Sequence, residues 1–551
     1  MDTVEDLFRR LEQLNEIGAA LSQEKSIDRL LEKILLAAKA ITRADGGTLY
    51  QLEQSEEGQR LKFAIMRNET LNIAMGGTTG KPIPFYPLHL IGKDGKPNNR
   101  MVACYAALTG NTVNIADAYV AEGFDFSGTR NIDKKTGYRS KSFLTVPMRN
   151  HEGAIIGVLQ LINSKDPETG EIVAFSNSDQ RLAESLASQA AIALTNRDLI
   201  NQLEELFQSF IQLINKAIDE KSPYTGGHCQ RVPVLTMMLA EAVNDTSDGP
   251  LRDFTMNDKD RYELKIAGLL HDCGKVTTPV HVVDKETKLQ TIFDRINLVD
   301  TRFEVLKRDA EIEFLRQTSK LARQSDLDEA EFEQRLEAGS QALRVKLRRL
   351  DEDREFLRHC NTGGESMSPE AQARVRQIGA AYKWLDASGA TANFLTEDEL
   401  ENLSISRGTL TAKERETINY HIKATIDMLE ALPWPKHLSN VPEYAGGHHE
   451  RMDGKGYPNG LTREQMSVQA RVMGIADIFE ALTAKDRPYK RGKTLSESLK
   501  ILGNFKLNGH IDPDLFDIFV RKKVYLRYAE QFLDPDQIDE VDESRIPGYS
   551  P

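Results

Sequence analysis

Apolar positions recur along the chain with two different periods, and the change between them separates two kinds of structure. Leu7, Leu11, Leu14 and Leu21 fall near one helical face, which predicts a helix over residues 5–22. Short apolar runs then predict strands at 47–52, 60–66, 111–115, 142–148 and 154–162. Strands mixed with helices over about 190 residues predict a compact α+β module of the sensor type, in which helices flank an antiparallel sheet.

One long helix is predicted over residues 178–220. In its second half the apolar spacings alternate between four and three, which is the heptad seam of a coiled coil. The register places Asn196 at a core position, where a polar residue fixes register and strand number. The seam consists of Leu199, Leu203, Leu206, Phe210, Leu213 and Ala217. This helix either packs on its own domain or connects two chains, and we favour a homodimer because the single apolar stripe lies between domains.

From about residue 222 to its end the chain is predicted to be helical. Residues 296–360 are highly charged and show two helical apolar patterns, separated by the turn-forming segment SDLDEAE. This arrangement predicts an antiparallel helical hairpin. The segment NTGGESMS at 361–368 is predicted to be a loop.

Composition and charge exclude several classes of function. The 551 residues carry a net charge of -13 with a pI near 5.5, so the chain has no general attraction for DNA, RNA or anionic lipid. No apolar run is long enough to cross a membrane, and the charged N-terminus lacks the apolar core of a secretion signal. Four widely separated cysteines fit free, buried thiols in a reducing cytoplasm.

Two histidine motifs suggest a metal centre in the C-terminal part. They are His271-Asp272-Cys273-Gly274-Lys275 and the segment HHERMDGKGYP, which begins at His448. Neutral imidazoles and carboxylates bind first-row divalent metals, and one carboxylate can bridge two ions. Two such ions suit phosphoryl transfer, since they activate water near neutral pH and offset negative charge. Without metals, burial of this set would leave several polar groups unpaired at about 1–3 kcal/mol each.

The segments around these motifs resemble the HD-GYP family, a branch of the HD phosphohydrolases. The resemblance covers about 210–295 and 405–530, and it rests on SPYTGGHCQRV, AGLLHDCGKVTTP, LTAKERETINYH, GGHHERMDGKGYP and ADIFEALTAKDRPYK. Members of the family hydrolyse cyclic di-GMP to pGpG and often on to GMP. The resemblance therefore implies a phosphodiesterase with two divalent metal ions. Iron or manganese is favoured over zinc, because six-coordinate sites suit those two metals.

The resemblance also implies roles for individual residues. One metal would be held by His228, His271, Asp272 and Asp477, and Asp272 would bridge to a second metal held by His421, His448 and His449. Asp272 and Lys275 are the catalytic candidates, with Lys275 at the scissile phosphate. Further substrate contacts are implied for the signature loop Gly456-Tyr457-Pro458 and for Arg487 and Lys490.

Two departures from the family pattern change the prediction. Tyr224 stands where some members have a glutamate that helps hold a third metal, so we expect two metals and pGpG as the main product. His271 and His421 are 150 positions apart, which indicates a helical insertion at about 296–400 within an intact core. A regulatory lid, a partner platform and a neutral decoration are equally compatible with this insertion.

The N-terminal module resembles the GAF family over about 25–195. GAF domains of cyclic-nucleotide phosphodiesterases and cyclases carry Asn-Lys, then Phe, then Asp-Glu. Here the pattern reads Asn163-Ser164, Phe175 and Asp179-Gln180, so the Lys and the Glu are replaced. Asn163, Phe175 and Asp179 are the candidate ligand contacts, and a structural role is their alternative. Three alternatives stay open for this module: it binds a cyclic nucleotide, it binds another small molecule, or it binds no ligand and serves only to dimerise.

Together these patterns predict a cytoplasmic, homodimeric cyclic di-GMP phosphodiesterase regulated by a GAF domain. The predicted parts are an N-terminal helix (1–24), the GAF domain (25–195), a connecting helix (178–222), an HD-GYP domain (223–535) and a tail (536–551). A hydrolase of another cyclic dinucleotide is one alternative, because Arg487 and Lys490 recognise charge more than base. The other alternative is a catalytically silent module that binds nucleotide or a diguanylate cyclase. The presence of all seven predicted metal ligands and Lys275 argues against it.

Overall fold

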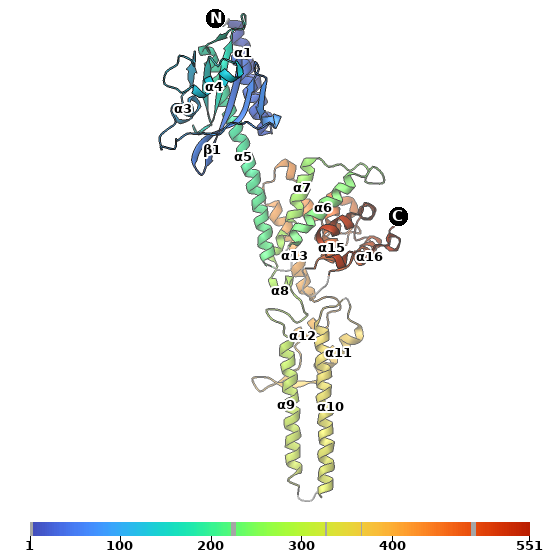
Figure 1. Ribbon diagram of the computed structural model, residues 1–551. Helices are drawn as coiled ribbons and strands as arrows, with labels where there is room; N and C mark the ends of the chain where they lie inside the picture. The colour runs from blue at the N-terminus through green and yellow to red at the C-terminus, as the bar shows by residue number, and fades with distance from the viewer. Residues whose placement is uncertain (1–3, 222–226, 325–327, 365, 486–491, 551) are drawn as a thin grey trace. The chain divides into compact units, whose positions relative to one another are not determined.

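A computed structural model describes residues 4–221, 227–324, 328–364, 366–485 and 492–550. The chain forms two compact units, Met1–Gln208 and Ser209–Pro551 (Figure 1). The predicted fold class is confirmed, because an α+β domain with an antiparallel sheet and a long helix precede a largely helical region. Among the described residues, no helix has the length and apolar content that a bilayer crossing requires.

The N-terminal unit is built on one antiparallel sheet with the order β3-β2-β1-β7-β6-β5, to which β4 and β8 are added at β2 and β7. The strands are β1 (Ala44–Ser55), β2 (Gly58–Asn68), β3 (Ile73–Gly76), β4 (Leu88–His89), β5 (Val113–Ile115), β6 (Phe143–Arg149), β7 (Ile155–Lys165) and β8 (Ile172–Val173). All five strands predicted from the apolar runs are present. The central strands are longer than predicted, because polar residues at their ends continue the ladder.

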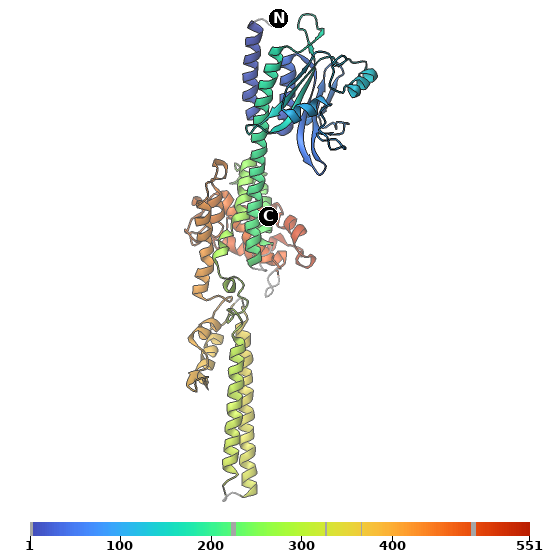
Figure 2. The same ribbon diagram turned by 90° about the vertical axis from the view of Figure 1, so that its left-hand side faces the viewer.

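Helices cover the two faces of this sheet differently. On one face α1 (Val4–Gln23), α2 (Ile27–Thr42) and the first part of α5 (Asn177–Lys221) form a helical layer (Figure 2). Alternation along β1 separates the faces, since Leu49 packs into this layer whereas Tyr50 packs on the other side. The other face carries α3 (Val102–Thr109) and α4 (Ser127–Thr136), whereas the short 3-10 turn η1 (Gly77–Thr79) lies against α2.

The long helix α5 is continuous from Asn177 to Lys221, as its apolar pattern predicts. Its seam residues are exposed in the single chain: Leu203 by 64%, Leu206 by 65%, Phe210 by 58% and Leu213 by 61%. Ile211 and Ile218, on another face of the same helix, are buried. The helix therefore carries an uncovered apolar stripe in addition to the face that packs within the chain.

The C-terminal unit has a helical core interrupted by an insertion. The core elements are α6 (His228–Asn244), α7 (Asp258–Leu270), η2 (Cys273–Thr277), α8 (Val280–Val283), α13 (Ala412–Glu430), η3 (Lys436–Leu438), α14 (Val441–Gly446), η4 (Arg463–Gln465), α15 (Val468–Thr483), α16 (Leu495–Leu507), α17 (Pro513–Arg521), α18 (Val524–Phe532), η5 (Pro535–Gln537) and η6 (Glu543–Arg545). All four cysteines of the chain are free and buried, as expected.

The insertion contains the predicted hairpin, formed by α9 (Ile296–Leu321) and α10 (Glu329–Asn361), which run side by side (Figure 1). Ion pairs join the two helices, such as Arg354 with Glu304 at 2.9 Å and Arg358 with Asp300 at 2.7 Å. Buried apolar residues lie near the base of the hairpin, where they pack against α11 (Pro369–Ala381) and α12 (Glu397–Leu403).

The prediction of helix throughout this unit was wrong between residues 383 and 393. There β9 (Lys383–Leu385) and β10 (Thr391–Asn393) form a small antiparallel hairpin. Its turn is fixed by Asp386, whose carboxylate accepts from the amides of Ser388 and Ala390, and by Gly389 at a φ of 81°. This turn chemistry outweighs the surrounding helical tendency.

The base of the insertion is closed by a buried ion pair. Lys285, just before the insertion, donates to both carboxylate oxygens of Glu414 at 2.7 and 2.8 Å and to Asn402 at 2.8 Å. Glu414 lies in the first turn of α13, the helix that carries His421. The two chain segments that flank the insertion are thereby held together at its root.

Candidate metal centre

Five helices bring the candidate ligands to one place in the C-terminal unit. His228 is the first residue of α6, and His271 caps the end of α7. Asp272 then begins the short turn η2, which carries Lys275. The remaining candidates come from α13, from the residues after α14 and from α15, and they are His421, His448, His449 and Asp477.

Asp272 lies at the centre of this arrangement. Its Oδ2 is 3.2 Å from Nε2 of His228 and 3.2 Å from Nε2 of His271. Its Oδ1 is 3.3 Å from Nε2 of His421, on the other side. Nε2 of His228 is also 3.3 Å from Oδ1 of Asp477. One carboxylate thus faces two groups of imidazoles, with a different oxygen toward each.

Two clusters of donor atoms can be distinguished. His228, His271 and Asp272 form one, and His421, His448 and His449 form the other; within each, one ligand atom per residue lies within 4.8 Å of the others. These are the two groups that the sequence motifs predict, with Asp477 beside the first. The ring centroids of His271 and His448 are 5.0 Å apart, so the clusters are adjacent.

The backbone orients three of the histidines. His271, His421 and His448 each place Nδ1 on the carbonyl oxygen three residues earlier, at 2.7 Å for Gly268 and 2.6 Å for Ala445. A ring that donates from Nδ1 presents an unprotonated Nε2. Nε2 of His421, Nε2 of His448 and Oδ1 of Asp272 are buried without a hydrogen-bond partner among the described residues. Such atoms are costly to bury, and this donor set fits divalent metal ions.

Burial and charge shift the pKa values of the candidate ligands in different directions. Burial lowers the pKa of His448 well below its usual value, helped by the neighbouring His449 and His271. Burial likewise lowers the pKa of His449 to about 4. Burial acts to raise the pKa of Asp272, but Lys275 and His271 outweigh it and hold the pKa well below the usual range. Burial acts to lower the pKa of His228, but the neighbouring carboxylates, that of Glu480 foremost, outweigh it and raise the pKa well above its usual value. His448 and His449 are thus neutral beside an ionised carboxylate, whereas His228 would have to release a proton to bind an ion.

Lys275 is the cation of the site. Its Nζ donates to Oδ2 of Asp272 at 2.5 Å. Burial acts to lower its pKa, but the carboxylates of Asp272 and Asp477 outweigh this effect and raise it. The ammonium group therefore keeps its charge inside the site. On its other side, the carbonyl oxygens of Lys275 and Val276 accept hydrogen bonds from Lys221, the last residue of α5, at 3.1 Å for Lys275.

Glycine at position 274 allows the close approach of η2 to α13. A Cβ atom there would lie 2.0 Å from the carbonyl oxygen of His421 and 2.5 Å from the amide of Thr425. The amide of Gly274 also donates to Oγ1 of Thr425 at 2.9 Å. This contact brings the turn of Asp272 and Lys275 against the helix of His421.

Two buried glutamates support the centre, and both lie within the quoted motifs although the sequence analysis gave them no role. Glu480 bonds Nδ1 of His228 and accepts from Nε of Arg231 at 2.7 Å. It follows Asp477 by three positions on α15, and this helical spacing could have indicated it. Glu450 accepts from the amides of Asn459 at 2.7 Å and Leu461 at 2.9 Å. It thereby holds the loop that contains Gly456-Tyr457-Pro458.

The signature loop lies against the second cluster. The ring of Tyr457 stacks on His449 with centroids 4.9 Å apart. A Cβ atom on Gly456 would lie 2.4 Å from the backbone of Glu450 and Arg451, so only glycine fits there. Tyr224, Arg487 and Lys490 lie outside the described residues, so their predicted roles stay predictions.

The three candidate ligand contacts of the N-terminal unit all have partners within the protein. Asn163, at a φ of 59°, accepts from the amides of Lys141 and Ser142 and donates to Tyr138 and Arg139. Phe175 belongs to the apolar core. Asp179 pairs with Arg10 and accepts from the amide of Ser176. None of the three is among the residues that line the pocket of about 330 Å³ in this unit.

Family models match both units. A GAF domain model matches residues 26–194, and HD domain models match 225–356 and 396–515. A solved GAF domain from an Acinetobacter phosphoenolpyruvate-protein phosphotransferase has 16% identity, covering 35% of this chain and 98% of that chain with a TM-score of 0.26.

Characterised relatives match the chain over limited segments. A cyclic di-GMP phosphodiesterase of Pseudomonas aeruginosa is 46% identical over 74 residues, which are 13% of this chain and 17% of that protein. The 3'3'-cGAMP-specific phosphodiesterase 1 of Vibrio cholerae is 43% identical over 83 residues, 15% of this chain and 19% of that protein. The 3'3'-cGAMP-specific phosphodiesterase 3 of the same organism is 24% identical over 309 residues, 56% of this chain and 37% of that protein. This chain thus spans well under half of each of these relatives. The chain has a GAF domain followed by HD domain segments, which contain two groups of histidine and aspartate side chains that could hold metal ions.

Proposed function

We propose that the HD domain segments form a metal-dependent phosphodiesterase that hydrolyses cyclic di-GMP to pGpG. The observation that carries this proposal is the position of Asp272, whose two oxygens face the two groups of imidazoles. His228, His271, Asp272 and Asp477 would hold one ion, and His421, His448 and His449 would hold the other. Iron or manganese suits this set of nitrogen and oxygen donors.

The bound ions would supply an activated water near neutral pH and offset the negative charge at phosphorus. The residues of the chain would stabilise the developing charge and bound the substrate. Lys275 keeps its charge beside Asp272 and would meet a phosphate oxygen as charge develops there. Tyr457, stacked on His449 and held by its loop, would bound the site on the substrate side.

The choice of substrate rests on the relatives together with the site. Cyclic di-GMP is named for the relative from Pseudomonas aeruginosa and for one from Thermotoga maritima, whereas 3'3'-cGAMP is named for two from Vibrio cholerae. Both are cyclic dinucleotides with two phosphodiester bonds, which is the chemistry the site accommodates. We place cyclic di-GMP first and 3'3'-cGAMP second.

The same proposal includes regulation by the GAF domain in a homodimer. The exposed heptad stripe of α5 supports pairing with a second copy, because five large apolar side chains there lack cover in the single chain. The hydrogen bonds from Lys221 to η2 support a route from this helix to Lys275.

The test is hydrolysis by anaerobically purified protein with its metal content measured in the same sample. We expect about two ions per chain, pGpG from cyclic di-GMP, and slower turnover of 3'3'-cGAMP. Asp272→Asn should lose both metal and activity, whereas Lys275→Met should keep the metal and lose activity. Asp258→Asn, an exposed substitution on α7, is the matched control. Full metal occupancy without hydrolysis of either dinucleotide would refute the proposal.

A further inference from the structure

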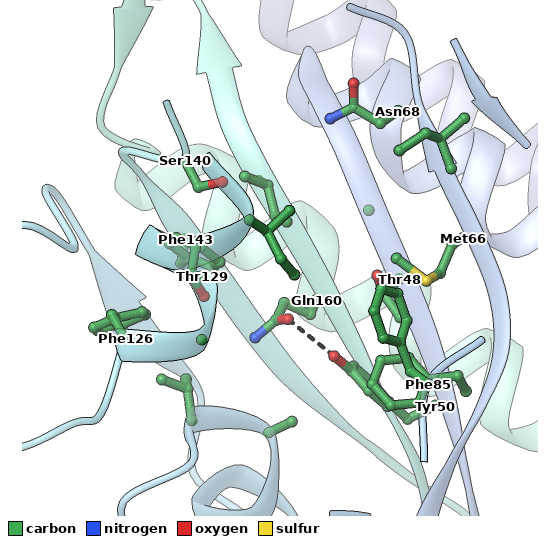
Figure 3. A pocket seen from close by; sticks show the side chains of 18 of the residues that line it. Thr48, Tyr50, Met66, Asn68, Phe85, Phe126, Thr129, Ser140, Phe143 and Gln160 are labelled. Atoms are coloured by element: carbon green, nitrogen blue, oxygen red, sulfur yellow. Dashed lines mark hydrogen bonds between the residues drawn. The ribbon is translucent and has the colours of Figure 1, made fainter. Parts of the chain in front are cut away.

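A second site lies in the N-terminal unit, on the face of the sheet opposite the helical layer. It is a pocket of about 330 Å³ between the sheet and α4. Figure 3 shows Thr48, Tyr50 and Gln160 on the sheet side and Phe126 and Thr129 on the other. The volume lies in the range of small-molecule sites, and the residues assigned above to metal and substrate take no part in it.

The walls of the pocket favour a flat, largely apolar ligand. Tyr50, Phe63 and Phe85 form one aromatic cluster, with successive ring centroids 4.8 and 5.4 Å apart. Phe126 and Phe143 form a second cluster with centroids 5.3 Å apart. Aliphatic and methionine side chains line the space between the two, and they are Met66, Leu71, Ile73, Met75, Leu88, Met101, Ile132 and Ile162. A planar ring is the shape that stacks best against such walls.

A few polar groups are placed where they can hydrogen-bond a ligand. The hydroxyl of Thr48 has no hydrogen-bond partner within the described part of the chain, although this residue is only 4% exposed. Beside it, Gln160 accepts from the hydroxyl of Tyr50 at 3.2 Å and donates to Thr145 at 3.1 Å (Figure 3). Thr48 and Gln160 both line the pocket, so their polar atoms provide an edge at which a ligand can form hydrogen bonds.

The charges around the pocket are unsuited to an anion. Of the lining residues, all of which are described, Arg67 alone is basic. Its guanidinium is already bound to Glu32 and to the carbonyl oxygens of Met66 and Met75, both at 2.8 Å. The positive end of α4 is also offset, since Asp125 accepts from the amide of Ser127 at 2.9 Å.

Asp133, the second acidic residue that lines the pocket, also has its hydrogen-bond partners within the protein. The buried carboxylate of Asp133 accepts from the hydroxyl of Tyr119 and from the amide and hydroxyl of Ser140, each at 2.8 Å. With two carboxylates and one neutralised guanidinium in the lining, a phosphate would find no cation to pair with.

We infer that this pocket binds an uncharged, planar heteroaromatic molecule and discriminates against its phosphorylated forms. The aromatic walls stack on the two faces of the ligand's ring, and Thr48 and Gln160 form hydrogen bonds with its polar edge. The inference is independent of the phosphodiesterase proposal, because it rests on the N-terminal unit alone. It excludes both the cyclic dinucleotide and a cyclic mononucleotide as ligands of this pocket.

Matched pairs of compounds test the inference on the full chain: adenosine and cyclic AMP, guanosine and cyclic GMP, and riboflavin and FMN. At least one uncharged member should raise the Tm and give a saturable calorimetric titration. Its phosphorylated partner should bind at least tenfold more weakly. Equal or tighter binding of the phosphorylated partner would overturn the inference, and so would a panel in which no uncharged member binds.

Two variants locate the binding. Thr48→Val keeps the side-chain shape and removes the hydroxyl, so affinity should fall about fivefold. Thr129→Trp, on α4, should fill the pocket and abolish binding. Thr136→Val at the exposed end of α4 is the matched control. The ligand-free Tm of each variant reports whether it folds, and unchanged affinity in folded Thr129→Trp would place the ligand elsewhere and reject this pocket.

Discussion

His228 is held between carboxylates on both sides of its ring. Nδ1 is bonded to Glu480, while Nε2 lies 3.2 Å from Asp272 and 3.3 Å from Asp477. Arg231 holds Glu480 in turn, at 2.7 Å. A carboxylate on the far nitrogen of a metal-binding histidine fixes the ring orientation and raises its basicity. Glu480 would therefore position His228 for the first of the two proposed ions.

Substitution of Glu480 should weaken metal binding without removing a ligand. In Glu480→Gln the affinity for the first ion should fall about 10- to 100-fold. Titration with Mn(II), followed by its paramagnetic resonance signal, measures this directly. Glu464→Gln, an exposed change in the same unit, should leave the titration unaltered. A Glu480→Gln protein with unchanged metal affinity would show that the contact is merely structural.

The exposed stripe of α5 should mediate dimer formation. Leu206→Lys places a charge in the seam while keeping a good helix former, so it should weaken the dimer by tenfold or more without unfolding the chain. Sedimentation equilibrium reports the dissociation constant. Leu315→Lys on α9 replaces a leucine that is 63% exposed and serves as the control. A monomeric parent protein would remove the basis for this prediction.

The ion pair at the root of the insertion should make stability depend on pH in the acid range. Burial acts to raise the pKa of Glu414, but Lys285 outweighs it and lowers the pKa. A carboxyl with a lowered pKa stabilises the fold above its unfolded pKa, near 4.5, and loses this contribution as the pH falls through its folded pKa.

Glu414→Gln should therefore lower the unfolding free energy by about 3 kcal/mol at pH 7, because Lys285 stays buried without its countercharge. The difference from the parent should shrink steadily below pH about 4.5. Urea denaturation at a series of pH values measures both effects. Glu430→Gln, exposed on the same helix, should follow the parent curve throughout, and a Glu414 difference that persists in acid would contradict the assignment.

The outer part of the hairpin should be dispensable for folding. Buried side chains of α9 and α10 lie up to Ala310 and from Leu350 onward. Replacement of residues 311–346 by a short glycine-serine linker should therefore change the unfolding free energy by less than about 1 kcal/mol. Metal content should stay the same. Loss of hydrolysis with metal retained would assign the hairpin a catalytic or regulatory role.

Elements with long patterns could be predicted from the sequence. The long helical pattern over residues 178–220 gave nearly the full extent of α5, and the two apolar series of the insertion gave its hairpin. The small strands at 383 and 391 could not be seen, because each is three residues long and depends on the turn at Asp386. Short elements carry too little periodicity to compete with a helical background.

The candidate ligands could be identified from the sequence because histidine motifs are rare and specific. The structure brings His228, His271 and His421 around Asp272, although His421 lies far along the chain. Glu480 was given no role from the sequence, although its spacing from Asp477 could have indicated one. Lys285 was missed because a single basic residue in a loop carries no signal of its own. The pocket of the GAF domain was also invisible, since its lining comes from many separate strands and loops.

The contact at the end of α5 determines which part of the candidate site a movement of this helix would reach. Lys221 is fastened to the backbone of the turn between Asp272 and α8, rather than to a side chain that could rotate away. A movement of Lys221 would therefore act on η2, the turn that follows Asp272 and carries Lys275. A signal arriving through α5 would then shift the candidate bridging carboxylate and the ammonium group of the site together.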